Sequence, residues 1–87
     1  MRWNSSKTPW NLTEGPGLYA LYEDDRLRYI GQSRNLYKRV GQHFRRKKWI
    51  TKIKWREERS EGEALMTEFR LIRRLRPEMN VSFTRGD

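Results

Sequence analysis

The sequence predicts a small α+β domain, a three-stranded antiparallel sheet flanked by helices in the order β-β-α-β-α. Two short apolar segments are joined by a tight turn, a third segment alternates polar and apolar residues, and two segments repeat apolar residues at helical spacing. The 87 residues suffice for one modest core. We assign residues 1–14 to a polar N-terminal arm that Trp3 and Trp10 could anchor, and residues 15–87 to a single domain.

The first two strands are expected to form a hairpin. The breakers at 15–17 precede the apolar run 18–22, which is typical of a strand buried on both faces. A turn at Asp24 and Asp25 leads to a second strand over residues 27–31. Such tight antiparallel pairing places Tyr19 and Tyr29 nearly opposite each other.

A helix and a third strand follow. Ser33 or Asn35 can cap a helix over residues 36–46. Gly41 inside it indicates a close approach to the backbone. Residues 50–57 alternate, which predicts a half-buried strand whose polar face is basic.

The second helix is predicted over residues 61–75. Ser60 and Glu63 have the spacing of a capping box, and Pro77 ends the helix. Residues 79–83 are a candidate for a short edge strand.

The composition restricts the class of protein. The net charge of +9 predicts an anionic partner, most often nucleic acid. The absence of cysteine excludes disulfides and thiolate zinc sites, and one histidine excludes a three-histidine metal site. No apolar run is long enough for a membrane span or a signal peptide, so we expect a cytoplasmic, DNA-associated protein without membrane contact.

Three polar residues interrupt or border the apolar faces of the helices. On a helical wheel, Glu68 falls within an apolar arc, which comprises Ala64, Leu65, Phe69, Leu71, Ile72 and Leu75. A carboxylate there must reach solvent, pair with an arginine or bind a cation. Arg39 and His43, four residues apart, share a face beside the apolar arc of the first helix. Because both helices should pack on one sheet, we expect the three side chains to converge.

The motifs resemble those of the GIY-YIG nuclease superfamily. Gly17-Leu18-Tyr19 and Tyr29-Ile30-Gly31, ten residues apart, resemble its paired motif. The helix bearing Arg39 and His43, the segment 63–72 with Glu68, and the segment 76–81 resemble three further elements in the same order. The similarity spans about residues 15–83.

The resemblance implies a DNA endonuclease that hydrolyses phosphodiester bonds with one divalent cation. Glu68 would bind this cation, Mg²⁺ or, in its place, Mn²⁺, with water and phosphate completing the shell. Arg39 would stabilise the scissile phosphate as negative charge builds. His43 would assist at the phosphate or relay a proton.

The tyrosines and two supporting residues complete the implied site. Tyr29, with Tyr19 beside it, would act on the attacking water as a base or by positioning it, and which tyrosine is the base stays open. Gly31 and Asn80 would support the local structure. Gln32 stands where many relatives, including the excision-repair branch, carry lysine, which speaks against a close tie to that branch.

Much of the positive charge is expected to contact DNA. The residues expected to do so are Arg34, Lys38, Arg45, Arg46, Lys47, Lys48, Lys52 and Lys54. Most relatives attach a separate DNA-binding domain, for which this length leaves no room. We therefore expect low sequence specificity, a preference for single strands, flaps or nicks, or specificity supplied by a partner protein or a homodimer.

Two other interpretations stay open. One is a catalytically inactive nuclease-fold module that only binds nucleic acid, against which the complete set of site residues argues. The other is a small basic RNA-binding protein, which leaves Glu68 unexplained. The pathway also stays open between DNA repair, phage and mobile-element roles.

Overall fold

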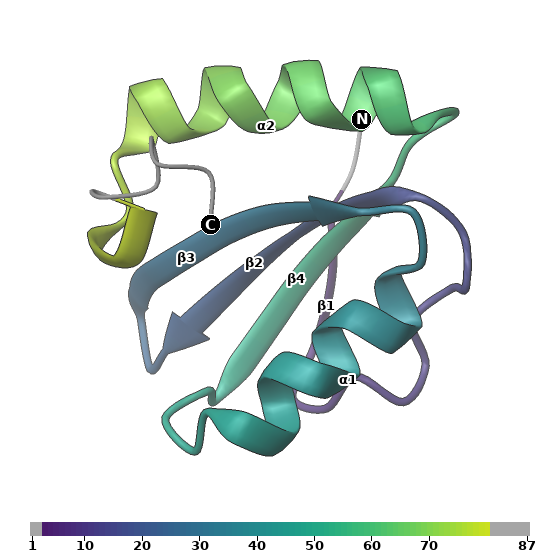
Figure 1. Cartoon of the computed structure of the whole chain (residues 1–87). Coiled ribbons are helices and arrows are strands. Elements are labelled where there is room, and N and C mark those ends of the chain that lie inside the picture. Colours follow the sequence, from purple (N-terminus) through teal and green to yellow (C-terminus); the bar gives the residue numbers. More distant parts are fainter. Residues whose placement is uncertain (1–2, 81–87) are drawn as a thin grey trace.

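Four strands and two helices make up the part of the chain that the computed structural model describes, residues 3–80 (Figure 1). In order they are β1 (Asn4–Ser6), β2 (Gly17–Glu23), β3 (Arg26–Ser33), α1 (Leu36–Arg46), β4 (Lys52–Glu57) and α2 (Glu61–Leu75), followed by a short 3-10 turn, η1 (Glu78–Asn80). The sheet is antiparallel, with strand order β1-β4-β2-β3. Figure 1 shows α1 and α2 on opposite sides of it. Within residues 3–80, neither helix has the length and apolarity to cross a bilayer.

The sheet has one strand more than predicted. β1 pairs with β4 in the register Asn4 to Trp55 and Ser6 to Ile53. Its sequence, Asn-Ser-Ser, lies mostly exposed at the edge of the sheet and carries no apolar alternation. The strand is therefore created by pairing with β4, and its own residues give no signal for it. Part of the predicted arm thus belongs to the sheet.

β2 is the central strand, as predicted. Its residues 17–21 are buried, because β3 and β4 flank the strand and a helix covers each face. The larger core lies between the sheet and α1. It is formed by Leu12, Tyr19, Leu21, Leu36, Val40, Ile50, Ile53 and Trp55.

The register of the hairpin differs slightly from the prediction. Tyr19 lies opposite Gly31, and Tyr29 lies opposite Leu21. The two tyrosines are therefore diagonal neighbours on one face of the sheet. A Cβ atom at Gly31 would lie 2.5 Å from Cζ and Oη of Tyr19, so only glycine leaves space for that ring.

Both helices have the predicted bounds and caps. The side chain of Asn35 accepts a hydrogen bond from Lys38 N at 3.0 Å, and that of Ser60 accepts one from Glu63 N at 3.2 Å. α2 ends at Arg76 in the left-handed conformation (φ 48°), directly before Pro77. The capping residues at the helix ends, which the sequence contains, therefore determine where both helices begin and end.

The buried face of α2 is narrower than the predicted apolar arc. Ala64 and Glu68 are buried, whereas Leu65, Phe69 and Leu75 are 53%, 60% and 51% exposed. The helix packs mainly on β3, an edge strand, so only a narrow stripe meets the sheet. The prediction was right for Glu68 and wrong for the three exposed residues.

Three smaller expectations also change. At Gly41 an added Cβ would meet only Trp10 and Arg45, at 3.8 and 3.9 Å, so no close approach requires glycine there. The last strand begins at Lys52 rather than residue 50. Residues 79–80 belong to η1 and not to an edge strand, and residues 81–83 lie outside the described residues.

Candidate active site

Three aromatic rings meet on the face of the sheet that α1 covers. The ring centroids of Tyr19 and Tyr29 are 6.0 Å apart, and each is 5.4 Å from the centroid of His43. Tyr19 Oη lies 3.0 Å from His43 Nε2. The hairpin thus supplies both tyrosines and α1 supplies the imidazole.

Tyr19 holds its proton firmly. Burial is the main cause that raises its pKa well above 10, and Tyr29 raises it further through its charge and a side-chain hydrogen bond. Arg39 lowers this pKa and Glu68 raises it, so both lie close enough to act on Tyr19. The phenol of Tyr19 is therefore a hydrogen-bond donor at neutral pH and a poor base. Tyr29 is the more exposed phenol of the pair.

His43 is a neutral imidazole at physiological pH. Burial, followed by the charges of Lys47, Arg39 and Arg46, lowers its pKa from 6.5 to about 4. A neutral ring has one acceptor nitrogen, which can take the Tyr19 hydroxyl proton in a hydrogen bond. His43 is thus suited to orient Tyr19 and carries no charge with which to bind a phosphate.

Glu68 is a buried carboxylate for which residues 3–80 supply no hydrogen-bond or ion-pair partner. The residue is 5% exposed, and no described residue forms a hydrogen bond or ion pair with it. Burial alone raises its pKa from 4.5 to about 7. A carboxyl group held in this way gains stabilisation from a nearby cation, because a cation offsets the lost hydration of the charged form.

The donor set fits a magnesium ion that retains much of its water. Among residues 3–80 no group of three histidine, aspartate or glutamate side chains lies together, so Glu68 would hold a cation without a cage of protein carboxylates. Mg²⁺ commonly binds proteins through one or two carboxylates and keeps several waters. Zinc, which prefers a closed set of nitrogen and sulfur ligands, does not fit these residues.

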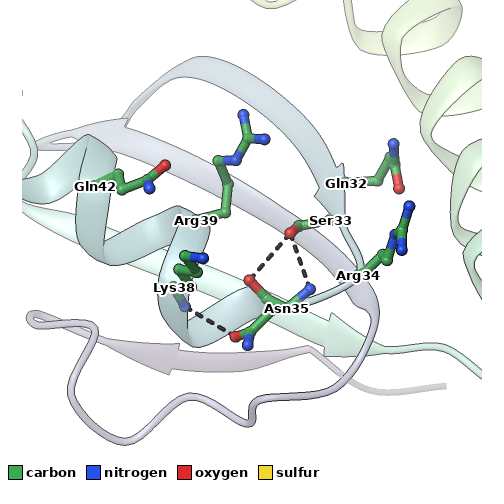
Figure 2. Close-up of a pocket in the computed structure, with 7 residues that line it drawn as sticks. All are labelled: Gln32, Ser33, Arg34, Asn35, Lys38, Arg39 and Gln42. Carbon is green, nitrogen blue, oxygen red and sulfur yellow. Dashed lines mark hydrogen bonds between the residues drawn. The ribbon is translucent and has the colours of Figure 1, made fainter.

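Arg39 stands between two hollows on the surface of α1. The larger, of about 400 Å³, lies between the end of β3 and the start of α1, where Figure 2 shows Arg39 projecting away from the helix. The smaller is lined by Arg39 together with His43, Arg46 and Lys47. Because its guanidinium is exposed and adjoins the imidazole, Arg39 connects the ring cluster to the basic surface.

Asn80 holds the open edge of β3. Its Oδ1 accepts a hydrogen bond from Ile30 N at 2.8 Å, and its Nδ2 donates one to Ile30 O at 3.1 Å. Ile30 lies between Tyr29 and Gly31. The Asn80 side chain therefore satisfies the backbone groups that a neighbouring strand would otherwise pair with, next to two residues of the candidate site. The bonds give Asn80 and Gly31 defined positions beside the ring cluster.

The residues expected to contact DNA divide between the two sides of the sheet. Six lie at or near α1, namely Arg34, Lys38, Arg45, Arg46, Lys47 and Lys48. Lys52 and Lys54 lie on the opposite face, over the ring of Tyr22 at 4.8 and 5.3 Å. Alternation along β4 causes the division, because Ile53 and Trp55 turn toward α1. The structure does not bring the two groups together.

Sequence reasoning missed the polar residues that line the larger hollow. Besides Arg34, Lys38 and Arg39, these are Gln32, Ser33, Asn35 and Gln42. Gln42 follows Arg39 by three residues and therefore shares its face of the helix, a signal that the spacing contained. The buried Oε1 of Gln32 has no hydrogen-bond partner among the described residues.

The sequence of this chain is similar to one family of known proteins. A family model for the UvrC-like GIY-YIG domain matches residues 15–81. UvrABC system protein C of Stenotrophomonas maltophilia is 39% identical over 82 residues, which cover 82% of this chain and 13% of the relative. The corresponding protein of Aquifex aeolicus is 35% identical over 81 residues, with 82% and 14% covered. The chain thus spans only about one seventh of the length of these relatives.

A solved structure shows the same fold. The GIY-YIG N-terminal endonuclease domain of UvrC from Thermotoga maritima, bound to magnesium as its catalytic divalent cation, matches with a TM-score of 0.74 and 26% identity. The match covers 84% of this chain and 91% of that domain. It confirms the predicted α+β fold with two helices and an antiparallel sheet. The UvrC-like family model also corrects the inference from Gln32, since that residue does not separate the chain from the repair branch.

Proposed function

Since the chain belongs to the UvrC-like GIY-YIG family, we propose that it is a DNA endonuclease that hydrolyses phosphodiester bonds with one divalent cation bound at Glu68. The observation that carries the proposal is the buried carboxylate of Glu68, which has no hydrogen-bond or ion-pair partner in the described part of the chain and acts electrostatically on the same tyrosine as Arg39. A purely structural helix would place an apolar residue at that position.

Glu68 holds the cation, which is Mg²⁺, with Mn²⁺ as a substitute. When bound, the cation supplies charge that polarises the phosphate and stabilises the leaving oxygen. The protein's task is to present one ionised oxygen ligand from a rigid helix. Burial leaves the Glu68 carboxyl near half-ionised at pH 7 without metal, so the bound cation also fixes its charged form.

Arg39 binds the scissile phosphate. Its guanidinium offers several donors in a planar fork, which matches the oxygens of a phosphate better than a lysine would. Its position at the rim of two hollows leaves room for a strand of DNA to pass. Negative charge that builds on the phosphate during hydrolysis is stabilised there.

Tyr29 acts on the attacking water. Tyr19 and His43 hold the Tyr29 ring in position. The raised pKa of Tyr19 supports a role as a proton donor in hydrogen bonds rather than as the base. Neutral His43 accepts from or donates to Tyr19 and so fixes its ring against Tyr29. We therefore assign the role of the base to Tyr29 rather than Tyr19.

DNA is bound along the basic side of α1. Phosphate contacts from exposed arginine and lysine side chains fix the position of DNA and do not read its sequence. Low sequence specificity, or preference for a DNA structure, follows from such a surface. The UvrABC system of the relatives favours a repair role, and specificity supplied by a partner protein is part of this proposal.

Cleavage assays test the proposal. Plasmid, single-stranded and branched DNA are incubated with Mg²⁺ or Mn²⁺ and with wild type, Glu68→Ala or Arg39→Ala. We expect wild type to cut and both variants to lose at least about a hundredfold in rate, the loss typical for one stabilising group. Glu63→Ala and Arg74→Ala, exposed residues of α2, serve as matched controls.

Two outcomes contradict the proposal. Equal cutting by wild type and both site variants would remove Glu68 and Arg39 from the chemistry. Retained DNA binding without cutting on any substrate would instead identify a module that only binds nucleic acid.

A further inference from the structure

Two adjoining hollows on the surface of α1, together called the groove here, lie one at Arg39 and one nearer the N-terminal segment. The hollow that contains Arg39 shares Asn35, Lys38 and Gln42 with a second hollow of about 360 Å³. The three shared residues form the wall common to the two hollows, so a ligand bound in one lies directly beside the other. Figure 2 shows Gln42 and Arg39 projecting from the same helix at the first of them.

The chemistry of the wall changes along this groove. Around Arg39 it is cationic, whereas the second hollow is lined by Tyr37, Arg45 and the carboxylate of Glu14. A phosphate gains nothing from a carboxylate at the wall. An aromatic ring beside a guanidinium and a hydrogen-bond acceptor matches a nucleobase, which has a stacking face and polar edges.

An exposed aromatic cluster completes the far end. Trp10 is 49% exposed and Tyr37 is 36% exposed, with ring centroids 6.3 Å apart. The guanidinium of Arg45 lies 5.6 Å from the centroid of Trp10. Phe44, which packs on the core, meets Trp10 edge to face at 5.8 Å and holds it in place. The rings are thus partly exposed, held by edge contacts and next to a cation, as in a base-stacking platform.

The span of the groove corresponds to a few nucleotides. Arg39 and Arg45 are six positions apart on one helix, or about 9 Å along its axis. The two side chains also project about 120° apart around the helix, so a strand that joins them curves around α1 and spans at least about three nucleotides at about 3.4 Å each. A strand whose phosphate lies at Arg39 therefore reaches the aromatic cluster with a base close to the cut.

We propose that Trp10 and Tyr37 bind an unpaired nucleobase of the DNA strand a few nucleotides from the scissile phosphate. The site selects DNA that has a single-stranded stretch beside the cut, such as a tail, flap or bubble. A fully paired duplex keeps its bases stacked and leaves the platform empty. The inference rests on the proposed function and adds the substrate class to it.

Another exposed aromatic ring with an arginine beside it, on α2, provides the control. Phe69 on the outer side of α2 is 60% exposed and has the guanidinium of Arg73 5.7 Å from its ring centroid. The hollow beside it includes Met66, Arg70 and Arg74 but shares no residue with the groove of α1. Phe69→Ala therefore removes an aromatic side chain that is more exposed than Trp10 or Tyr37 without touching the groove.

Binding measurements in EDTA separate this inference from catalysis. Fluorescence anisotropy gives the affinity for one duplex in two forms, blunt and with a short oligothymidine tail. Wild type should prefer the tailed form, and Trp10→Ala and Tyr37→Ala should each lose about fivefold or more of affinity for it. Their affinity for the blunt duplex, and both affinities of Phe69→Ala, should stay within about twofold. Thermal melting of each variant confirms folding, and Tyr37→Ala keeps the test valid if Trp10→Ala melts early.

The alternatives give different results. Equal losses on tailed and blunt DNA, or no loss on either, would overturn the base-binding role. So would a loss of the same size in Phe69→Ala. Cleavage in Mg²⁺ is measured separately, so a failure of the platform and a failure of the endonuclease proposal are told apart.

Discussion

Replacing Glu68 by glutamine should stabilise the metal-free protein while it removes activity. Burial raises the pKa of Glu68 from 4.5 to about 7, so the folded state disfavours the charged carboxylate. The unfolded chain ionises freely at the lower value. The stability that the protonated group allows is therefore fully present below pH 4.5 and is lost as the pH rises through about 7.

The magnitude follows from the two pKa values. One pH unit corresponds to about 1.4 kcal/mol, so the difference between 4.5 and about 7 amounts to roughly 3 kcal/mol at pH 8. At pH 5 the Glu68 carboxyl is mostly protonated in the folded state. Its raised pKa then destabilises the fold by less than about 1 kcal/mol. Glutamine has the shape of the protonated side chain and never ionises. Glu68→Gln should therefore raise the free energy of unfolding by roughly 2–3 kcal/mol at pH 8 and by under about 1 kcal/mol at pH 5.

Urea and thermal denaturation in EDTA, followed by far-ultraviolet circular dichroism at both pH values, measure this difference. A gain of 1 kcal/mol corresponds to about 4–8 °C in Tm for a domain of this size. Mg²⁺ should then raise the Tm of wild type and leave Glu68→Gln unchanged, because only the carboxylate binds the cation. Glu63→Gln, at an exposed position of the same helix, should change stability by less than about 0.5 kcal/mol.

Two results would refute the reasoning. A lower stability of Glu68→Gln at pH 8 would mean that the carboxylate is paired in solution. An effect of equal size at pH 5 and pH 8 would mean that ionisation is not its cause.

Three further substitutions test the surroundings of the site. Gly31→Ala places a Cβ 2.5 Å from the ring of Tyr19 and should lower stability by about 1–3 kcal/mol, together with cleavage; an unchanged Tm would contradict the contact. Gly41→Ala meets only ordinary contacts at 3.8 and 3.9 Å and should raise stability by about 0.5–1 kcal/mol, so a drop in Tm would count against it. Asn80→Ala leaves both backbone groups of Ile30 without their partner and should lower stability by about 1–3 kcal/mol, with faster hydrogen exchange of that amide; unchanged protection would rule out the edge role.

The helices show how far local signals reach. The caps at Asn35 and Ser60, the helical spacing of the apolar residues and Pro77 fixed both helices at the predicted bounds. These signals act between residues a few positions apart, so the neighbouring sequence contains them completely. Glu68 could also be recognised, because a carboxylate among apolar residues breaks a pattern that is itself local.

The pairing of β1 and the register of the hairpin could not be predicted from local sequence signals. β1 has no pattern of its own and exists because β4 offers it an open edge. The register that puts Tyr19 over Gly31 depends on hydrogen bonds between strands, and a shift of one residue would turn every side chain to the other face. Neither could be predicted from the residues within the strand.

The sequence by itself determined the kinds of element, the ends of the helices and the residues that do not belong on an apolar face. The tertiary structure decided which neighbours those residues meet. It placed α2 along an edge strand, which buries Glu68 and exposes Phe69, and it turned Lys52 and Lys54 away from the basic side of α1. The physical reason is range: periodicity and caps are interactions within a few residues, whereas burial, pKa and the composition of a groove depend on segments distant in sequence. The excess positive charge shows the same division, since its amount is set by composition and its distribution over two faces by the sheet.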